Sequence, residues 1–116
     1  MVQYPSVQRS IGEMSVAIQS GRLLLIDAAL TDRDEDPIAS VLAVNRAKQY
    51  CAEVGVSVTD AAMRMAGGGG LLKSSPLERL RRDALSGPVM PPANDRCLET
   101  IGKLECGLPA VTVELT

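Results

Sequence analysis

Histidine, tryptophan and phenylalanine are absent from this 116-residue chain, and tyrosine occurs only twice. Without histidine the chain can form neither a Ser-His-Asp triad nor a His-ligated zinc site, and no imidazole can act as a general base. With almost no aromatic rings, it has no platform on which the bases of a single-stranded nucleic acid could stack. The core must therefore be aliphatic, built from alanine, valine, leucine, isoleucine and methionine.

The chain also has no excess of positive charge, since twelve basic and fourteen acidic side chains leave a formal net charge of −2. We therefore expect no nucleic-acid partner, because nucleic-acid binding depends mainly on positive charge. The three cysteines, Cys51, Cys97 and Cys106, are odd in number and lack CxxC spacing. They predict reduced thiols in a cytoplasmic protein rather than a disulfide framework or a zinc knuckle.

Long apolar runs are missing as well. No run approaches the roughly 20 residues that a transmembrane helix needs, and residues 1–5 lack the pattern of a signal peptide, so we expect no membrane association. A hydrophobic fraction of 46% is nevertheless too high for a disordered chain, and the length suffices for one domain. We predict a single domain over residues 1–116, with a core of about residues 5–107 and a short tail, residues 108–116.

Two long stretches repeat apolar residues at helical spacing, and they predict helices over residues 6–31 and from Pro37 to about residue 66. Residues 54–59 also alternate like a strand, but the helical stripe continues on both sides of them. The acidic loop between the two helices lacks the glycine and terminal glutamate of an EF-hand, so we interpret it as a solvated turn in which Asp36 caps the second helix.

Two shorter helices follow. Ser75 and Glu78 have the spacing of a capping box and predict a helix over residues 76–85, and a last helix begins at Asn94 or Asp95 and ends near Cys106. Four helices and no strand predict an all-α, up-and-down four-helix bundle. Because each long helix would span about 40 Å, two short helices cannot cover their apolar faces. The missing surface is expected to come from another chain or from a part of the protein outside this sequence.

Two motifs near the end of the second long helix carry a resemblance to a known family. The first runs from Arg64 into four glycines at positions 67–70, and the second runs from Pro76 through an Arg-Asp-Ala sequence that ends at Ala84. Together they resemble the C-terminal helical domain of the acyl-CoA dehydrogenase superfamily, in which a Gly-Gly-x-Gly turn precedes the same second motif. Gly12-Glu13-Met14 and Ala47-Lys48 are also similar to that family, and the likeness extends over about residues 4–107.

The resemblance implies a FAD enzyme that removes hydrogens from the α and β carbons of an acyl-CoA thioester. Members are usually homotetramers, and two further domains that hold most of the acyl-CoA pocket are not in this sequence. We therefore expect a C-terminal domain that contributes flavin contacts and an oligomer interface and is inactive alone. Self-association or a companion acyl-CoA dehydrogenase-like chain would complete it, and acyl-CoA would bind only to the complete enzyme.

The glycine turn is the candidate cofactor-binding site. The resemblance places Gly67, Gly68 and Gly69 against the flavin diphosphate, where a backbone without side chains lets N–H groups approach a phosphate closely. The spacing alone favours a structural role instead, as a helix C-cap and a tight turn between helices. Arg64 stands where many members have a glutamine that contacts the cofactor, and it also fits an exposed helix residue.

The expected catalytic base is missing. Many dehydrogenases of this family place a glutamate eight residues after the aspartate of the Arg-Asp-Ala motif, and counting from Asp83 leads to Pro91, which cannot abstract a proton. Asp95 could serve only if the register slips, so we predict no catalytic residue. Glu78, Arg82 and Asp83 are expected to be structural, the first as a capping residue and the others in ion pairs between helices.

Two alternative functions remain open from the sequence. The superfamily has a flavin monooxygenase branch that lacks this glutamate and often shows a Ser-Ser-Pro-Leu-Glu-Arg-Leu run, which residues 74–80 resemble. The other alternative is a non-catalytic helical assembly module that has kept the surface through which the family assembles and has lost its chemistry.

Overall fold

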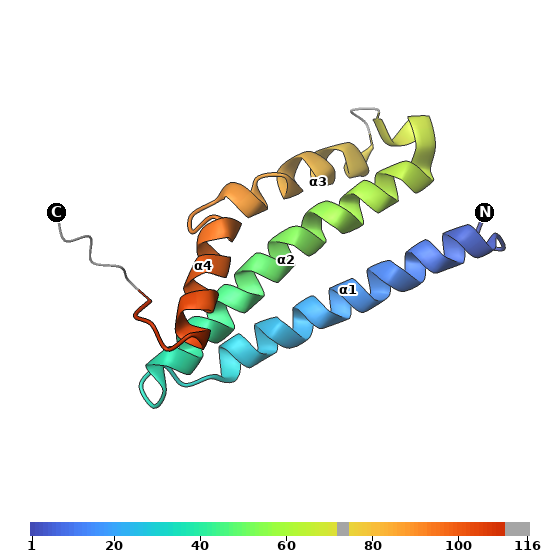
Figure 1. Ribbon diagram of the computed structural model, residues 1–116. Helices are drawn as coiled ribbons and strands as arrows, with labels where there is room; N and C mark the ends of the chain where they lie inside the picture. Colours follow the sequence, from blue (N-terminus) through green and yellow to red (C-terminus); the bar gives the residue numbers. More distant parts are fainter. Residues whose placement is uncertain (72–74, 111–116) are drawn as a thin grey trace.

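The computed structural model describes residues 1–71 and 75–110. The helices are α1 (Pro5–Leu30), α2 (Pro37–Ala66), α3 (Pro76–Ala84) and α4 (Asn94–Glu105), with short 3-10 helices η1 (Gly67–Leu71) and η2 (Gly87–Val89) between them (Figure 1). The described part of the chain contains no strand, which confirms the all-α prediction, and residues 54–59 lie inside α2. The predicted helix ends differ from the observed ones by at most one residue.

Local capping explains where two of the helices begin. The Oδ1 atom of Asp36 accepts a hydrogen bond of 3.0 Å from the backbone N–H of Ala39, and Pro37 occupies the first turn of α2. Similarly, Ser75 Oγ accepts a hydrogen bond of 3.3 Å from the backbone N–H of Leu77 at the start of α3. Each side-chain oxygen satisfies a donor that has no partner within its helix, so both predicted N-caps are confirmed.

The long helix α2 is the centre of the fold. It makes the main contacts of the other three helices: α1 packs along one flank, and α3 and α4 follow one another along the other (Figure 1). The chain thus runs along α1, back along α2, and returns through α3 and then α4 (Figure 1). Its extents of 54 × 30 × 21 Å reflect the length of the two long helices. Because α4 succeeds α3 on the same flank, the four helices form an open arrangement rather than a closed ring.

Few side chains of the described residues are fully buried, and those that are lie on α2 and α4. Ala43 and Ala47 of α2 are 2% and 3% exposed, and Cys97 of α4 is fully buried. Two polar residues, Ser40 and Asn94, join them in the core. Small side chains at positions 43 and 47 let neighbouring helices approach α2 closely, and the buried Cys97 and Asn94 mark where α4 packs on α2.

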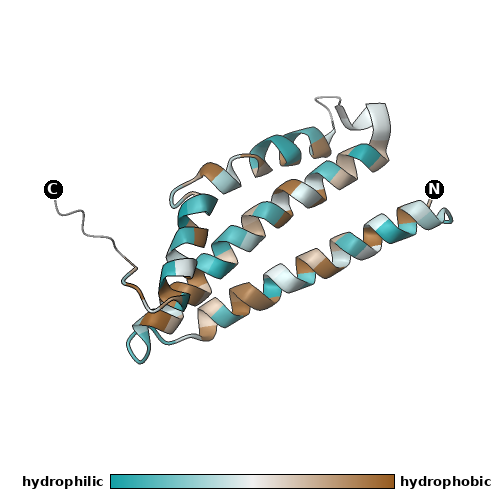
Figure 2. Ribbon diagram, in the orientation of Figure 1, coloured by the Kyte–Doolittle hydropathy of each residue, from teal (hydrophilic) through white to brown (hydrophobic). Residues whose placement is uncertain are grey.

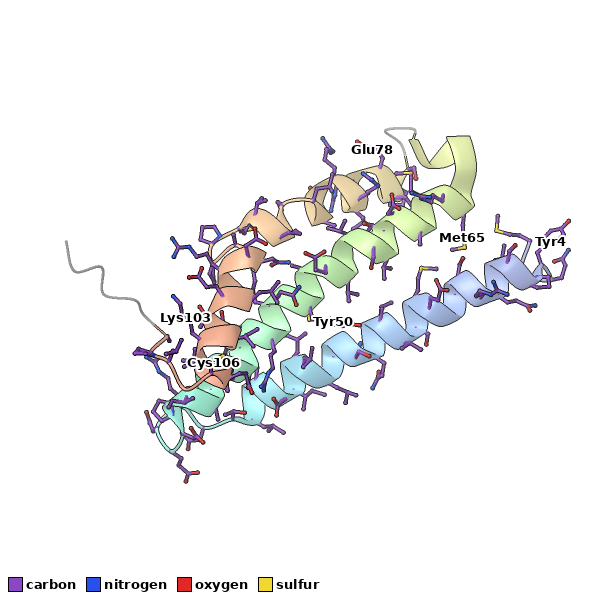
Figure 3. The ribbon with its side chains drawn as sticks, viewed as in Figure 1. Tyr4, Tyr50, Met65, Glu78, Lys103 and Cys106 are labelled. Carbon is purple, nitrogen blue, oxygen red and sulfur yellow. The ribbon has the colours of Figure 1, made fainter. Side chains whose placement is uncertain are left out.

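A close approach also joins α1 to α2. Gly21 is the buried residue of α1, and a Cβ atom built there would lie 3.3 Å from the sulfur of Cys51 and 3.8 Å from the ring of Tyr50. Figure 3 shows Tyr50 between the two helices. Glycine at position 21 is therefore favoured by space rather than by backbone conformation, since a larger residue would push the Cys51 side chain aside.

Much of the remaining apolar surface is exposed. Figure 2 shows hydrophobic residues gathered at the end of α1 and the start of α2. The large exposed apolar side chains of these two helices are Ile11, Val16, Ile18, Leu23, Leu25, Ile26, Leu30, Ile38, Val41 and Val44. The long helices therefore carry more apolar surface than the described residues cover. Despite this apolar character, none of the described helices is long and apolar enough to cross a membrane.

Candidate functional site at the glycine turn

The glycine turn lies at the end of α2, and the backbone dihedral angle φ becomes positive at its first residue. Gly67 has a φ of 66°, in the left-handed region that favours glycine, and its N–H group donates a hydrogen bond to the carbonyl oxygen of Met63. The run then continues as η1. The predicted C-cap is confirmed, and the left-handed conformation at Gly67 explains why a glycine stands at this first position.

The four glycines of the turn differ in how closely other residues approach them. Among the described residues other than each glycine's two chain neighbours, no heavy atom lies within 4 Å of a Cβ atom built at Gly67, Gly68 or Gly69, and all three residues are exposed. Gly70 is buried instead, and a Cβ atom there would lie 2.8 Å from the sulfur of Met63. Packing thus requires a glycine at position 70, whereas the backbone of residues 67–69 is bare and open to an approaching group.

Arg64 lies one helical turn before the glycines. Its side chain is 81% exposed, which confirms an exposed helix residue, and its Nε atom lies 3.0 Å from Oδ2 of Asp60. This i,i+4 pair is visible in the sequence spacing but was missed. The structure brings Arg64 and the three glycines to the same end of α2, while the cofactor contact of Arg64 stays a prediction.

Asp60 links the two helices that flank the turn. Its Oδ1 atom accepts hydrogen bonds from Arg81 of α3, at 3.0 Å from Nη2 and 3.3 Å from Nε. The hydrogen bond from Arg81, reinforced by the positive charge of Arg64, holds the pKa of Asp60 below its ordinary value. The carboxylate is therefore charged at neutral pH and connects the two arginines.

The ion pairs of α3 differ from those we predicted. Arg82 pairs with Glu78 at 3.4 Å, and Arg79 pairs with Asp83 at 3.7 Å, both within α3. The prediction that Arg82 and Asp83 pair between helices is therefore wrong. Their i,i+4 neighbours on the same helix are nearer partners, and Arg81 makes the interhelical pair instead.

A shallow groove runs between α2 and α3 below the turn. Its volume is about 440 Å³, and it is lined by Asp60, Met63, Glu78, Arg81, Arg82 and Leu85. Figure 3 shows Glu78 near the start of α3. Because the carboxylates of this groove are paired with its arginines, the groove offers charged side chains without a strong excess of one sign.

The predicted base position lies in another part of the molecule. Pro91 is exposed in the segment between η2 and α4, and Asp95 is exposed in the first turn of α4. Neither residue belongs to the set that lines the groove described above. Asp95 therefore lies apart from the glycine turn along the chain, and no finding assigns it the role of a base.

Asn94, beside these residues, is a structural residue that sequence reasoning missed. Its Nδ2 atom donates to Glu53 Oε1 at 2.8 Å and to the backbone oxygen of Gln49 at 3.2 Å. Its Oδ1 atom accepts from Lys48 Nζ at 2.8 Å, and the same ammonium group donates to the backbone oxygen of Gly87 at 3.0 Å. This network joins η2 and the start of α4 to the middle of α2.

The cysteines and carboxylates do not form a metal centre in the part of the chain that the structure describes. No three cysteine, aspartate or glutamate side chains gather there as ligands would. Cys51, Cys97 and Cys106 are free thiols, and burial raises the pKa of the Cys51 thiol. A raised thiol pKa lowers the fraction of reactive thiolate, so Cys51 is suited to packing rather than to nucleophilic chemistry.

Comparison with known proteins extends over most of the chain. The family model described as acyl-CoA dehydrogenase, C-terminal domain, matches residues 1–103. A short-chain specific mitochondrial acyl-CoA dehydrogenase from Bos taurus is 32% identical over 84 residues, which are 72% of this chain and 20% of that protein. A short-chain specific acyl-CoA dehydrogenase from Clostridium acetobutylicum is 39% identical over 74 residues, or 64% of this chain and 19% of that protein.

A relative that is named for a different reaction shows the same level of sequence identity. A 3-sulfinopropanoyl-CoA desulfinase from Cupriavidus necator is 32% identical over 84 residues, or 72% of this chain and 20% of that protein. The chain thus spans about a fifth of the length of these curated relatives. No solved structure gives a significant match to the chain.

Proposed function

The chain belongs to the acyl-CoA dehydrogenase family as its C-terminal domain, and we propose that it contributes flavin contacts to a FAD-dependent oxidoreductase of this family. The reaction proposed for the complete enzyme is the α,β-dehydrogenation of an acyl-CoA thioester. The observation that carries the proposal is the bare backbone of Gly67, Gly68 and Gly69 at the end of α2.

These glycines fit the diphosphate of FAD. A phosphate oxygen can approach a backbone that has no side chains and that no other described side chain covers, and Arg64 could add a charge-assisted hydrogen bond. Bound FAD supplies the hydride acceptor of such an enzyme. The residues of this chain would bind and orient the cofactor, and none of them is proposed to move a proton.

The lack of a base at position 91 supports a binding role for this chain. A proline there cannot take the α-proton, and the chain spans only about a fifth of the relatives that it matches. We therefore propose that the isolated chain is inactive and that acyl-CoA binds only in the complete enzyme. The desulfinase among the relatives supports assigning cofactor contact, rather than the choice of reaction, to this domain.

The exposed apolar faces of α1 and α2 support an assembly role. Contiguous apolar surface of this kind marks interaction sites in soluble proteins. We propose that self-association, or a companion acyl-CoA dehydrogenase-like chain, covers these faces and forms the oligomer interface. The three free cysteines support a reducing, cytoplasmic location for this assembly.

A non-catalytic assembly module is the second candidate, favoured by Pro91 together with the same exposed surface. The monooxygenase alternative depends on a run that includes Ser74, which lies outside the described residues, so the structure adds no observation in its favour.

The test is flavin retention by the purified chain. If self-association or a companion chain completes the cofactor site, we expect a flavin absorbance band to survive incubation with FAD and desalting, with no bleaching on addition of an acyl-CoA. Gly68→Val, which places a side chain on the bare turn, should lose most of the band. Gly12→Val is the matched control, because a Cβ atom at Gly12 also meets nothing within 4 Å but lies on α1.

The outcomes separate the two candidates. Equal flavin retention by Gly68→Val and Gly12→Val would contradict a contact at the glycine turn. If the wild-type chain retains no flavin and size-exclusion chromatography shows a stable oligomer, the result favours the assembly module.

A further inference from the structure

The carboxylate of Asp60 is shared between two arginines that are held unequally. Arg81 reaches it across the α2–α3 contact with two nitrogens, and the Arg81 side chain is 35% exposed. Arg64 reaches it along α2 through Nε, and its side chain is 81% exposed. The pair with Arg64 is therefore the one that solvent and other anions can compete for.

The contact with Asp60 also directs Arg64 away from the glycine turn. Asp60 lies four residues before Arg64, whereas the glycines begin three residues after it. Side chains of an α-helix point toward its N-terminus, which favours this backward contact. An exposed i,i+4 pair contributes little to stability, while an arginine can form stronger, bidentate hydrogen bonds with a phosphate.

We propose that Arg64 is a transferable anion contact, which leaves Asp60 and turns to a phosphate group held at the glycine turn while Arg81 stays paired with Asp60. The proposal rests on the proposed flavin contact at that turn. Transfer leaves no carboxylate without a partner, because Arg81 alone donates two hydrogen bonds to Asp60. The strength of the Asp60–Arg81 pair thus sets how readily Arg64 is released.

Two substitutions that break the same interhelical pair should have opposite effects on anion binding. Asp60→Asn removes the carboxylate that competes for Arg64, so anion binding at the turn should strengthen. Arg81→Leu removes one of the two arginines that pair with Asp60 and leaves Arg64 as the other. Asp60 then holds Arg64 more firmly, so anion binding should weaken. If Asp60 and Arg81 served only to hold α3 on α2, both substitutions would change binding in the same direction.

The R64A background separates transfer from general electrostatics. Asp60→Asn and Arg81→Leu also change the net charge near the turn in opposite senses, and this effect does not require Arg64. A cycle with Arg64→Ala isolates the coupling between the positions. Transfer predicts that both substitutions lose their effect on anion binding once Arg64 is removed, whereas a general charge effect would persist.

The experiment is a titration of the full chain with inorganic pyrophosphate at low salt, followed by NMR. The reporters are the backbone amides of residues 67–70 and the Nε–H group of Arg64. Relative to the wild type, we expect about two- to five-fold tighter binding for Asp60→Asn and about two- to five-fold weaker binding for Arg81→Leu. Arg81→Lys, which keeps the charge but loses the fork of donors, should show a smaller weakening and guards against loss of α3 in the leucine variant.

Four results would overturn the inference: no pyrophosphate response at the turn, unchanged affinity in Arg64→Ala, shifts of the same sign in Asp60→Asn and Arg81→Leu, or effects that persist without Arg64. Its failure is distinguishable from failure of the flavin contact. If Gly68→Val loses flavin while Arg64→Ala binds pyrophosphate normally, the glycine turn contacts the cofactor without a transferred arginine.

Discussion

The middle of α2 and its C-terminal end are held to their neighbours by different means. Ala43 and Ala47 of α2 are buried, and so are Asn94 and Cys97 of α4, where Asn94 is bonded to Glu53 in the middle of α2. Facing α3, the end of α2 has no such core: α3 buries no residue, and its ribbon is mostly hydrophilic in Figure 2. There the ion pair between Arg81 and Asp60 joins the two helices.

This difference assigns the two regions different tasks. Close packing fixes geometry, because a buried contact cannot shift without leaving a void or a clash. A contact held by exposed charges can exchange its partners with solvent or with a ligand, and binding elements are drawn from such less stable regions. The glycine turn adjoins the region held by charges, while the contact with α4 keeps the opposite part of the molecule in place.

Asn94→Ala should have the largest effect on stability. The substitution removes three side-chain hydrogen bonds from a residue that is 5% exposed, so that Glu53 loses the amide bonded to its Oε1 atom and Lys48 keeps only its bond to Gly87. We expect the free energy of unfolding to fall by about 2–3 kcal/mol, measured by urea denaturation. Asn45→Ala is the control, because Asn45 donates only to Val41 within its own helix. Its change should stay within about 0.5 kcal/mol, and equal losses in both variants would remove the special role of Asn94.

Ala47→Leu should rank second and tests the same comparison on one helix. Ala47 is 3% exposed, so the added atoms must displace neighbours, and we expect a loss of about 2 kcal/mol in urea denaturation. Ala62→Leu makes the same change in the C-terminal part of α2, where Ala62 is only half-buried. Its loss should be below about 1 kcal/mol. If Ala62→Leu is the more damaging variant, the end of α2 is packed more tightly than its exposure indicates.

Local signals allowed most of the fold to be predicted from the sequence. The apolar stripes place α1 and α2, and Asp36 and Ser75 mark helix starts because their side chains bond to backbone N–H groups only a few residues away. The glycine turn is equally local, since a left-handed residue is required just after α2 ends. The motif resemblance, rather than the spacing, predicted a cofactor role for that turn.

Contacts between distant residues could not be predicted in the same way. The Asp60–Arg81 pair joins residues 21 positions apart, and the bond from Lys48 to Asn94 joins residues 46 positions apart. Their formation depends on how α3 and α4 settle on α2, which no periodicity in the sequence specifies. This is why the pairing of Arg82 and Asp83 was assigned wrongly, and why Asn94 was predicted only as a helix start.

Acid titration gives the smallest expected effect and sharpens the comparison further. Arg81, and then Arg64, hold the pKa of Asp60 in the folded chain below its ordinary value of 3.8. The charged carboxylate therefore stabilises the fold at pH values above 3.8, and this contribution is lost as the pH falls through the lowered pKa. Asp60→Asn should make the urea midpoint less dependent on pH in this acid range.

Asp34→Asn, in the exposed loop between α1 and α2, is the control and should follow the wild type in the same titration. The effect of Asp60 should also be local, because the hydrogen bonds of its carboxylate join α2 to α3 rather than to α4. Amide exchange should therefore show that α3 loses protection on acidification before α4 does. Simultaneous loss in both helices would mean that α3 and α4 open as one unit, so that charge pairing and close packing would not separate the two regions.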